Sequence, residues 1–446
     1  MTILARDRHI VIVGLGVTGL SCARYLHERG MSFSVMDTRY DPPGLDELNQ
    51  LAPGIEVITG KLDRNRLGEA SEVWLSPGVP LAHPDIAAVK DQVIVRGDVD
   101  VFSQEAKAPI IAISGSNGKS TVTSMVGEMA KACGVHVAIG GNLGTPVLDL
   151  LAPEVELYVV ELSSFQLETT EKLGAKAATV LNLSQDHMDR YPDMMAYHLA
   201  KMRVFFGCRH MVLNKQDTLA QPPMMEGAEV TWFSLTPPEP KQFGVISSGD
   251  RHFLARGSEV LLDADDLKVK GRHNWSNALA ALALAQAAGL SLPICLETLK
   301  EFTGLEHRCE WVGKYNGIEF INDSKATNVG ATIAALEGLG PVISGQLVLI
   351  CGGQGKGQDF DALFKCVERH VGAAVVLGQD RQLLRDGLAA RMPVHEVNTL
   401  EEAVAAAAAI SQEGDLVLLS PACASLDMFR NYMERGEEFK RWVKAL

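Results

Sequence analysis

A glycine-rich segment in the first third of the chain has the residue types of a phosphate-binding loop. Gly115-Ser-Asn-Gly-Lys-Ser-Thr121 follows a short apolar run that ends at Ile113, and a helical pattern begins at Thr121. Glycines let consecutive backbone amides face one anion, the start of the next helix adds positive potential, and Lys119 adds a point charge. Ser120 and Thr121 offer hydroxyls to Mg²⁺. We therefore predict an ATP-binding loop, although Ile113 stands where the usual pattern has its first glycine.

Acidic and imidazole groups follow two later strands. Glu161 ends the apolar run Leu157 to Glu161, the place where P-loop folds hold Mg²⁺ through an acidic oxygen. The apolar run Ala178 to Leu183 leads into Asp186-His-Met-Asp-Arg-Tyr-Pro192. Open α/β sheets bind ligands at the ends of such strands, so we predict that both groups belong to a site. Lys201, by sequence alone, has only the features of a surface lysine.

The N-terminal segment contains a dinucleotide-type fingerprint. Gly14-x-Gly16-x-x-Gly19 follows an apolar strand, and Asp37 ends the next strand, about twenty residues beyond the glycines. Taken alone, this pattern predicts NAD, with Asp37 on a ribose. Any nucleotide diphosphate could occupy the same helix N-terminus, and Arg39 suits an additional phosphate. The pattern leaves both kinds of ligand open.

Strands alternate with helices along most of the chain, which is typical of parallel α/β sheets. We predict three domains, over residues 1–97, 98–304 and 305–446. Between 207 and 270 the strand-like pieces are shorter, which predicts an accessory sheet within the central domain. Polar clusters follow successive strands of the last domain, the expected edge for a binding site.

The composition describes globular domains and narrows the class of partner. The chain has 446 residues, more than one compact core holds, with 47% hydrophobic and 22% charged residues. A net charge of -14 argues against nucleic acid, because DNA binding needs a basic surface. The eight cysteines form no C-x-x-C pair, so neither a zinc site nor a disulfide framework is predicted. The apolar stretches are too short to span a membrane, and the N-terminus has no signal pattern. We therefore predict a cytoplasmic protein without membrane insertion.

Five phrases together resemble the Mur ligases of bacterial peptidoglycan synthesis. They are Gly115-Ser-Asn-Gly-Lys-Ser-Thr, Glu161-Leu-Ser-Ser-Phe-Gln-Leu-Glu168, Asp186-His-Met-Asp-Arg-Tyr-Pro192, Asn322-Asp-Ser-Lys-Ala-Thr-Asn328 and Ser420-Pro-Ala-Cys-Ala-Ser-Leu-Asp427. With the N-terminal glycine-rich unit, the resemblance covers all three domains, and the shortened phosphate loop is normal for that family. It implies a Rossmann-like N-terminal domain, a central P-loop ATPase-type α/β domain with an accessory sheet, and a Rossmann-like C-terminal domain.

The resemblance implies an ATP-dependent ligase that works through an acyl phosphate. The phrases around Asp186 and Ser420 favour the family member that adds D-glutamate over those that add L-alanine, a diamino acid or a dipeptide. Such an enzyme joins D-glutamate to the L-alanyl carboxylate of UDP-N-acetylmuramoyl-L-alanine, in cytoplasmic peptidoglycan precursor synthesis. The implied cofactors are ATP and two Mg²⁺ ions, with a CO₂-derived carbamate on Lys201. We expect a monomer.

The resemblance also implies roles for individual positions. The residues expected in catalysis are Lys119, Glu161, His187 and Lys201, and those expected to hold the metal ions are Ser120, Glu161, His187 and Lys201. The residues expected to contact ATP are Gly115, Ser116, Asn117, Gly118, Lys119, Ser120, Thr121, Asn277, Arg308, Asp323 and Lys325. The residues expected to contact the muramyl substrate are Val17, Thr18, Asp37, Thr38, Arg39, Asn142 and His187. The residues expected to contact D-glutamate are Thr327, Lys356, Ser425, Leu426 and Tyr432.

Two other classes of protein are competing interpretations of the residues. An NAD-dependent oxidoreductase would use the N-terminal glycines and Asp37, and would leave the phosphate loop without a role. A nucleotide-gated binding protein would keep that loop but would not need Glu161, His187 and Lys201 together.

Overall fold

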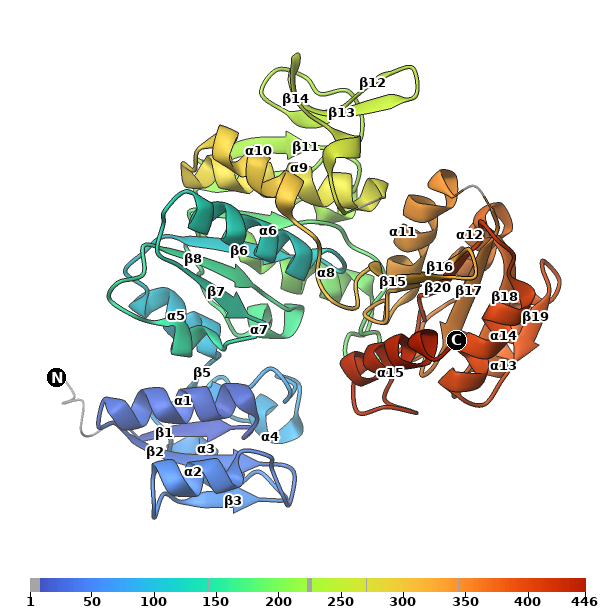
Figure 1. The fold of residues 1–446 in the computed structure, drawn as a ribbon. Coiled ribbons are helices and arrows are strands. Elements are labelled where there is room, and N and C mark those ends of the chain that lie inside the picture. The colour runs from blue at the N-terminus through green and yellow to red at the C-terminus, as the bar shows by residue number, and fades with distance from the viewer. Residues whose placement is uncertain (1–8, 143, 223–226, 270, 344) are drawn as a thin grey trace. The chain divides into compact units, whose positions relative to one another are not determined.

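The fold is known from a computed structural model, shown in Figure 1, which contains three sheets among the residues it describes. The described residues are 9–142, 144–222, 227–269, 271–343 and 345–446. The chain divides into two compact units; the first holds residues up to 182 with 195–233 and 280–295, and the second holds 183–194, 234–279 and 296–446. No helix in the described part of the chain is long and apolar enough to span a bilayer.

The first sheet is parallel and has the order β3-β2-β1-β4-β5. Its strands are β1 (His9–Val13), β2 (Ser32–Asp37), β3 (Val57–Thr59), β4 (Glu72–Leu75) and β5 (Ile94–Arg96). Its helices are α1 (Val17–Glu28), α2 (Leu45–Leu51), α3 (Arg64–Glu69) and α4 (Pro84–Ala87). Gly19 lets α1 pack closely on the end of β1, because a Cβ there would lie 1.9 Å from the Gly14 carbonyl oxygen. The strand order reverses at β1, between β2 and β4, and ligands bind at such a switch point in open sheets.

The central sheet has the strand order β14-β13-β12-β11-β10-β9-β6-β8-β7. Its parallel strands are β6 (Ile110–Ser114), β7 (Val137–Gly141), β8 (Leu157–Glu161), β9 (Ala177–Val180), β10 (His210–Asn214) and β11 (Glu229–Phe233); β12 (Phe243–Ser248), β13 (Arg251–Arg256) and β14 (Glu259–Asp263) are antiparallel. The segments expected to form an accessory sheet therefore continue the central sheet instead of forming a separate one.

The helices of the central region lie between these strands and after them in the chain. They are α5 (Asp98–Glu105), α6 (Lys119–Ala132), α7 (Ser164–Glu168), α8 (Met194–Met202), α9 (Arg272–Ala288) and α10 (Leu292–Glu301), with the short 3₁₀ helices η2 (Val147–Leu150), η3 (Arg203–Phe205), η4 (Thr218–Ala220) and η5 (Ala264–Asp266). The predicted domain boundaries fall at Gly97, directly before α5, and in the segment that follows α10. The boundaries themselves stay a prediction.

The third sheet has the order β15-β16-β20-β17-β18-β19 and is parallel except for β15. Its strands are β15 (Glu310–Tyr315), β16 (Ile318–Asn322), β17 (Leu347–Gly352), β18 (Val371–Leu377), β19 (Val394–Glu396) and β20 (Leu416–Leu419). Its helices are α11 (Val329–Leu339), α12 (Asp361–His370), α13 (Arg381–Leu388), α14 (Leu400–Ile410) and α15 (Tyr432–Lys444), with the 3₁₀ helix η6 (Gly340–Val342). Successive residues of β17 enter different core clusters, Leu349 one and Ile350 the other, so both faces of this sheet are buried.

Asp98, the first residue of α5, is a buried carboxyl group. It is 2% exposed, and neither carboxyl oxygen has a hydrogen-bond partner of normal geometry in the part of the chain that the structure describes. Burial raises its pKa to about 6, although the nearby amides of Val99 and Asp98 act in the opposite direction. The folded state therefore keeps this proton to a higher pH than the unfolded state. Ionisation of Asp98 should lower the free energy of unfolding as pH rises from about 4 to about 6, and this decrease should be complete above that range.

Replacing Asp98 by asparagine should remove this pH dependence. Relative to the original chain, Asp98→Asn should gain about 3 kcal/mol of stability between pH 4 and pH 7, the value of a shift of roughly two pKa units. Thermal unfolding across that range measures the gain, with the exposed Asp46→Asn as a control of unchanged pH dependence. A constant difference between Asp98→Asn and the original chain at every pH would contradict this account.

Candidate active site and nucleotide cavity

The predicted phosphate loop connects the carboxyl end of β6 to α6. Gly118 precedes the helix with a φ of 83°, a left-handed conformation that glycine adopts without strain. The helix begins at Lys119, two residues before the start that the sequence pattern predicted. Lys119 Nζ donates to the carbonyl oxygens of Gly115 at 2.8 Å and Ser116 at 2.9 Å. The side chain therefore folds back over the loop and places its ammonium group beside the loop backbone.

Asn182, which the sequence analysis did not identify, fixes the conformation of this loop. Its Oδ1 accepts a hydrogen bond from the Asn117 amide at 2.8 Å, and its Nδ2 donates to the Asn117 carbonyl at 3.0 Å. The Ser116 amide donates to the Asn182 carbonyl at 2.9 Å. Asn182 comes two residues after β9, and β9 lies beside β6 in the sheet. Its place after a neighbouring strand is the only sequence signal that could have identified it.

Glu161 contacts two other predicted site residues from separate segments, Ser120 and Asn142. This carboxylate is 2% exposed at the end of β8, and β8 lies between β6 and β7. Its Oε2 accepts a hydrogen bond from Ser120 Oγ at 2.6 Å, and its Oε1 accepts one from Asn142 Nδ2 at 2.6 Å. Carboxylate, hydroxyl and amide oxygens are the hard donors that Mg²⁺ prefers. The residues present therefore fit a magnesium ion beside the phosphate loop.

Lys201 is not the surface lysine that the sequence alone predicted. It is 2% exposed in α8, and its Nζ donates to the Gly115 carbonyl at 2.9 Å and lies 3.5 Å from Ser114 Oγ. Tyr197, one turn earlier, is 1% exposed, and its hydroxyl lies 3.1 Å from Ser116 Oγ. The spacing of Tyr197 and Lys201 places both on one buried face of α8, and this was the signal available in the sequence. An ammonium group cannot itself ligate a metal ion, because it has no lone pair to donate.

His187 lies in the second unit, in the segment 183–194. Its φ is 59°, its amide donates to Asp186 Oδ1 at 2.9 Å, and its Nε2 lies 3.6 Å from Asp186 Oδ2. Asn277 lies in the same unit, near the start of α9, and its Nδ2 donates to Asn274 Oδ1 at 3.2 Å. The roles of His187 and Asn277 in metal and ATP binding stay predictions.

A cavity of about 550 Å³ lies in the first unit, between the N-terminal sheet and the central sheet. Its lining includes six residues predicted to contact the muramyl substrate, namely Val17, Thr18, Asp37, Thr38, Arg39 and Asn142. It also includes the segment Ser76–Val79 and Gln166, which the sequence analysis did not single out as site residues. Ser76 follows β4, the neighbour of β1 at the switch point, and this position was the available signal.

Asp37 forms the centre of a hydrogen-bonded turn in this cavity. Its Oδ2 accepts from the Leu15 amide at 2.7 Å and from Arg39 Nη2 at 2.6 Å, and its Oδ1 accepts from the Arg39 amide at 2.8 Å and Nε at 2.9 Å. Burial raises the pKa of Asp37, but the hydrogen bonds from Arg39 and Leu15 outweigh it and leave that pKa below its usual value. The carboxylate therefore stays charged and holds Arg39 beside the glycine-rich turn.

Asp323 follows β16 in the third sheet and is 7% exposed. Its Oδ2 accepts from Ser420 Oγ at 2.8 Å, and its Oδ1 accepts from the Cys309 amide at 3.2 Å. Burial raises its pKa to about 7, against the opposing effects of Ser420 and Arg308. Two residues downstream, Lys325 Nζ lies 4.0 Å from the centroid of the Tyr432 ring. Lys325, which is predicted to contact ATP, thus lies beside Tyr432, which is predicted to contact D-glutamate.

The other residues predicted to contact D-glutamate lie on loops after strands of the same sheet. Gln354 and Ala424 exchange backbone hydrogen bonds of 3.0 and 2.9 Å, which join the loop of Lys356 to the loop of Ser425 and Leu426. Ser425 is 3% exposed, Leu426 is 64% exposed, and Lys356 has a φ of 53°. The Thr327 amide donates to the Lys325 carbonyl at 2.8 Å.

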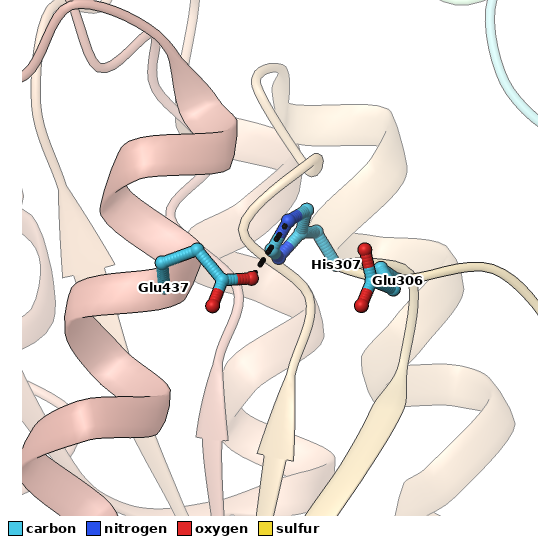
Figure 2. A group of neighbouring side chains, drawn as sticks. All are labelled: Glu306, His307 and Glu437. Atoms are coloured by element: carbon cyan, nitrogen blue, oxygen red, sulfur yellow. Dashed lines mark ion pairs between the residues drawn. The ribbon is translucent and has the colours of Figure 1, made fainter.

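One further group of possible metal ligands lies in the second unit. Figure 2 shows Glu306, His307 and Glu437, whose ligand atoms lie within 4.8 Å of one another. Lys440 already forms ion pairs with both carboxylates, with Nζ 2.6 Å from Glu437 Oε1 and 3.6 Å from Glu306 Oε1. His307 is 4% exposed, and burial lowers its pKa. We interpret the group as an ion-pair network that joins α15 to the segment before β15.

Comparison with known proteins identifies the family. Three family models match successive parts of the chain: the Mur ligase MurD-like N-terminal domain over residues 8–96, the Mur ligase middle domain over 113–285, and the Mur ligase glutamate ligase domain over 307–423. A UDP-N-acetylmuramoylalanine–D-glutamate ligase from Hahella chejuensis is 66% identical, and the match covers 100% of both chains. The enzymes of that name from Pseudomonas putida and Pseudomonas aeruginosa are 53% and 52% identical, over 100% of this chain and 99% and 100% of theirs.

Solved structures share the fold at lower identity. A pseudomurein peptide ligase type C from Methanothermus fervidus gives a TM-score of 0.62 at 16% identity, over 98% of this chain and 100% of that one. A UDP-N-acetylmuramate-alanine ligase from Thermotoga maritima gives 0.61 at 20% identity, with the same coverage. The structural matches support the three-sheet α/β architecture, and the full-length relatives establish the lineage. The chain belongs to the Mur ligase family.

Proposed function

We propose that this Mur ligase joins D-glutamate to the L-alanyl carboxylate of UDP-N-acetylmuramoyl-L-alanine, with ATP converted to ADP and phosphate, in cytoplasmic peptidoglycan precursor synthesis. The observation that carries the proposal is the relative of that name, 66% identical over the whole chain. The contact of Lys119 with the Gly115 carbonyl and the contact of Ser120 with Glu161 agree with it, because Lys119 and Ser120 are adjacent residues of the same loop and helix start. The expected monomeric state stays a prediction.

The proposed reaction has two steps. An oxygen of the substrate carboxylate attacks the γ-phosphorus of ATP, the bond from that phosphorus to the bridging oxygen breaks, and ADP leaves. The amine nitrogen of D-glutamate then attacks the acyl carbon of the acyl phosphate, phosphate leaves from the tetrahedral intermediate, and the nitrogen gives up a proton. The first step brings two anions together, so it needs charge neutralisation. Lys119 and the amides of the loop Gly115–Gly118 offer positive groups at the phosphates.

We propose that Ser120 and Glu161 hold the magnesium ion at the ATP phosphates, and that His187 and Lys201 hold a second one. Bound Mg²⁺ supplies positive charge to the phosphate oxygens. Lys201 fits this role only as a carbamate, formed when its neutral amine adds to CO₂ and releases a proton. That reaction replaces an ammonium group with an anionic oxygen donor. The short distance from Lys201 Nζ to the Gly115 carbonyl supports the assignment, because it places the amine at the phosphate loop.

We propose that the cavity between the first two sheets binds the uridine diphosphate part of the muramyl substrate. The N-cap residue of α1 is Gly16, which has no side chain to accept from the first amides of that helix and leaves room for a phosphate at this position. Arg39 is half-exposed beside the glycine-rich turn and can pair with the ligand. The oxidoreductase interpretation would leave the Glu161 cluster and Lys201 without a role. We propose that Arg308, Asp323 and Lys325, in segments next to the third sheet, contact ATP, and that Asn277 of α9 contacts it as well. We propose that the loops of Lys356 and Ser425 bind D-glutamate.

Phosphate release tests this function directly. Mg-ATP and UDP-N-acetylmuramoyl-L-alanine should give phosphate with D-glutamate, and at least about 100-fold less with L-glutamate, L-alanine, a diamino acid or no amino acid, because a site built for particular polar groups rejects analogues that leave them unpaired. Turnover with another amine would contradict the substrate and keep the ligase chemistry. Binding of ATP without phosphate release under any condition would favour the nucleotide-gated binding protein.

A further inference from the structure

A carboxylate that the sequence analysis did not identify joins the two walls of the nucleotide cavity. Asp149 lies in η2, the short helix that follows the cavity-lining residue Pro146. Its Oδ1 accepts a hydrogen bond from Ser21 Oγ at 2.8 Å, and its Oδ2 accepts one from Arg24 Nη2 at 2.5 Å. Ser21 and Arg24 belong to α1, which packs against η2. One side chain of the central region thus holds the first helix of the N-terminal region, and all these residues lie in the first unit.

The residues that contact Asp149 lie on the same face of α1 as a residue of the cavity. Val17, Ser21 and Arg24 stand at positions i, i+4 and i+7, which share one face of an α-helix. Val17 lines the cavity, at the end of α1 that follows the glycine-rich turn. A helix of this length moves as one body, so a displacement at Ser21 and Arg24 also displaces Val17. The opposite wall includes Pro146, three residues before Asp149.

The Asp149 contact differs from the exposed ion pairs elsewhere on this chain. Ser21 is fully buried, so its hydroxyl cannot exchange this charge-assisted hydrogen bond for one to bulk water. Arg24 Nη1 donates to Glu47 Oε1 at 2.8 Å, which ties the same guanidinium to α2. The hydrogen bond to Asp149 raises the pKa of Arg24, so the guanidinium stays charged. Most surface ion pairs contribute little to stability because both partners are mobile in water. The Asp149 contact is less subject to this loss, because one of its partners, Ser21, is buried.

We propose that Asp149 is a positioning residue that sets the separation of the two cavity walls and thereby the affinity for the UDP-linked substrate. It acts through Ser21 and Arg24 on Val17 and the glycine-rich turn, and it need not touch the substrate. The inference rests on the proposed function, because it takes the ligand of this cavity to be a uridine diphosphate derivative. Affinity for ATP should not depend on Asp149, because the phosphate loop is fixed by Asn182.

The experiment compares UDP binding with steady-state kinetics in matched variants. For Asp149→Ala, the Kd for UDP measured by calorimetry and the KM for UDP-N-acetylmuramoyl-L-alanine should both rise about 5- to 10-fold, while kcat and the KM for ATP change less than about 2-fold. Ser21→Ala removes one of the two hydrogen bonds and should raise the same constants about 3-fold. Adding Ser21→Ala to Asp149→Ala should have no further effect, because Asp149→Ala already removes the hydrogen bond that Ser21 donates.

The matched control is Asp85→Asn, which breaks an ion pair of 3.1 Å with Arg64 between helices of the N-terminal region and should leave the Kd for UDP unchanged. Melting temperatures identify any variant that is unfolded at the assay temperature. If Asp149→Ala fails to fold, Ser21→Ala decides the question. Unchanged UDP affinity in both variants would overturn the positioning role alone. A wild-type chain with no affinity for UDP would overturn the ligand of the cavity and this inference with it.

Discussion

Lys201→Ala should lower kcat at least about 100-fold, and short carboxylic acids such as acetate or propionate should restore part of the lost activity. The physical reason is charge: the proposed carbamate is an anionic oxygen donor, and its loss removes a metal ligand beside the phosphate loop. A small carboxylate can enter the space left by the truncated side chain and supply equivalent oxygens. The measurement is phosphate release with 0 to 200 mM added carboxylate, the upper value being on the order of the weak affinity expected for so small a ligand.

The control for this rescue is Lys176→Ala. Lys176 lies in the first unit and its Nζ donates to the Ala288 carbonyl at 2.7 Å, so its removal also deletes a lysine hydrogen bond, away from the phosphate loop. Added carboxylates should not change its activity. A second readout is independent of turnover: ¹³CO₂ should give a carbamate resonance that Lys201→Ala lacks. Failure of rescue, together with an unmodified lysine in the active enzyme, would show that Lys201 acts as a cation.

The parts of the site that could be predicted are those built by local backbone geometry. The phosphate loop follows from Gly115, Gly118 and Lys119, because the chain must turn there whatever surrounds it. Glu161 could be placed because it ends an apolar strand, and the ends of neighbouring parallel strands meet at one edge. The three-domain α/β architecture follows from the alternation of strands and helices, and the structure confirms it with three sheets.

The missed features depend on interactions between segments far apart in sequence. Lys201 is buried because α8 packs against the phosphate loop, and lysine as a residue type predicts exposure, so its spacing from Tyr197 was the one signal of burial in the sequence. Asn182 acts through Asn117, which lies 65 positions away, and Asp149 acts through Ser21 at a separation of 128. The strands β10 and β11 were placed in an accessory sheet because they are short, whereas their parallel pairing extends the central sheet. Pairing partners are set by the whole sheet and cannot be read from one strand.

Glu161→Gln should reduce kcat about 100- to 1,000-fold and raise the Mg²⁺ concentration that gives half-maximal activity. The amide keeps the size of the side chain but removes its charge. An NH₂ group also replaces one of the two oxygens that now accept from Ser120 Oγ and Asn142 Nδ2, so one of these donors faces another donor. Asn142→Ala leaves the charge in place, so its effect should be smaller, about 10-fold, and the Mg²⁺ requirement should change little.

The comparison with Asn142→Ala separates loss of the metal ligand from loss of the hydrogen-bond network, because both variants break a contact to Glu161 but only Glu161→Gln removes the negative charge. Glu156→Gln is the matched control, since it makes the same substitution directly before the other end of β8, where the carboxylate accepts from the His136 amide. It should leave both kcat and the Mg²⁺ requirement unchanged. If Glu161→Gln lowers kcat with an unchanged Mg²⁺ requirement, Glu161 orients Ser120 and Asn142 and does not bind the ion, and the metal must then be held by other groups at the phosphates.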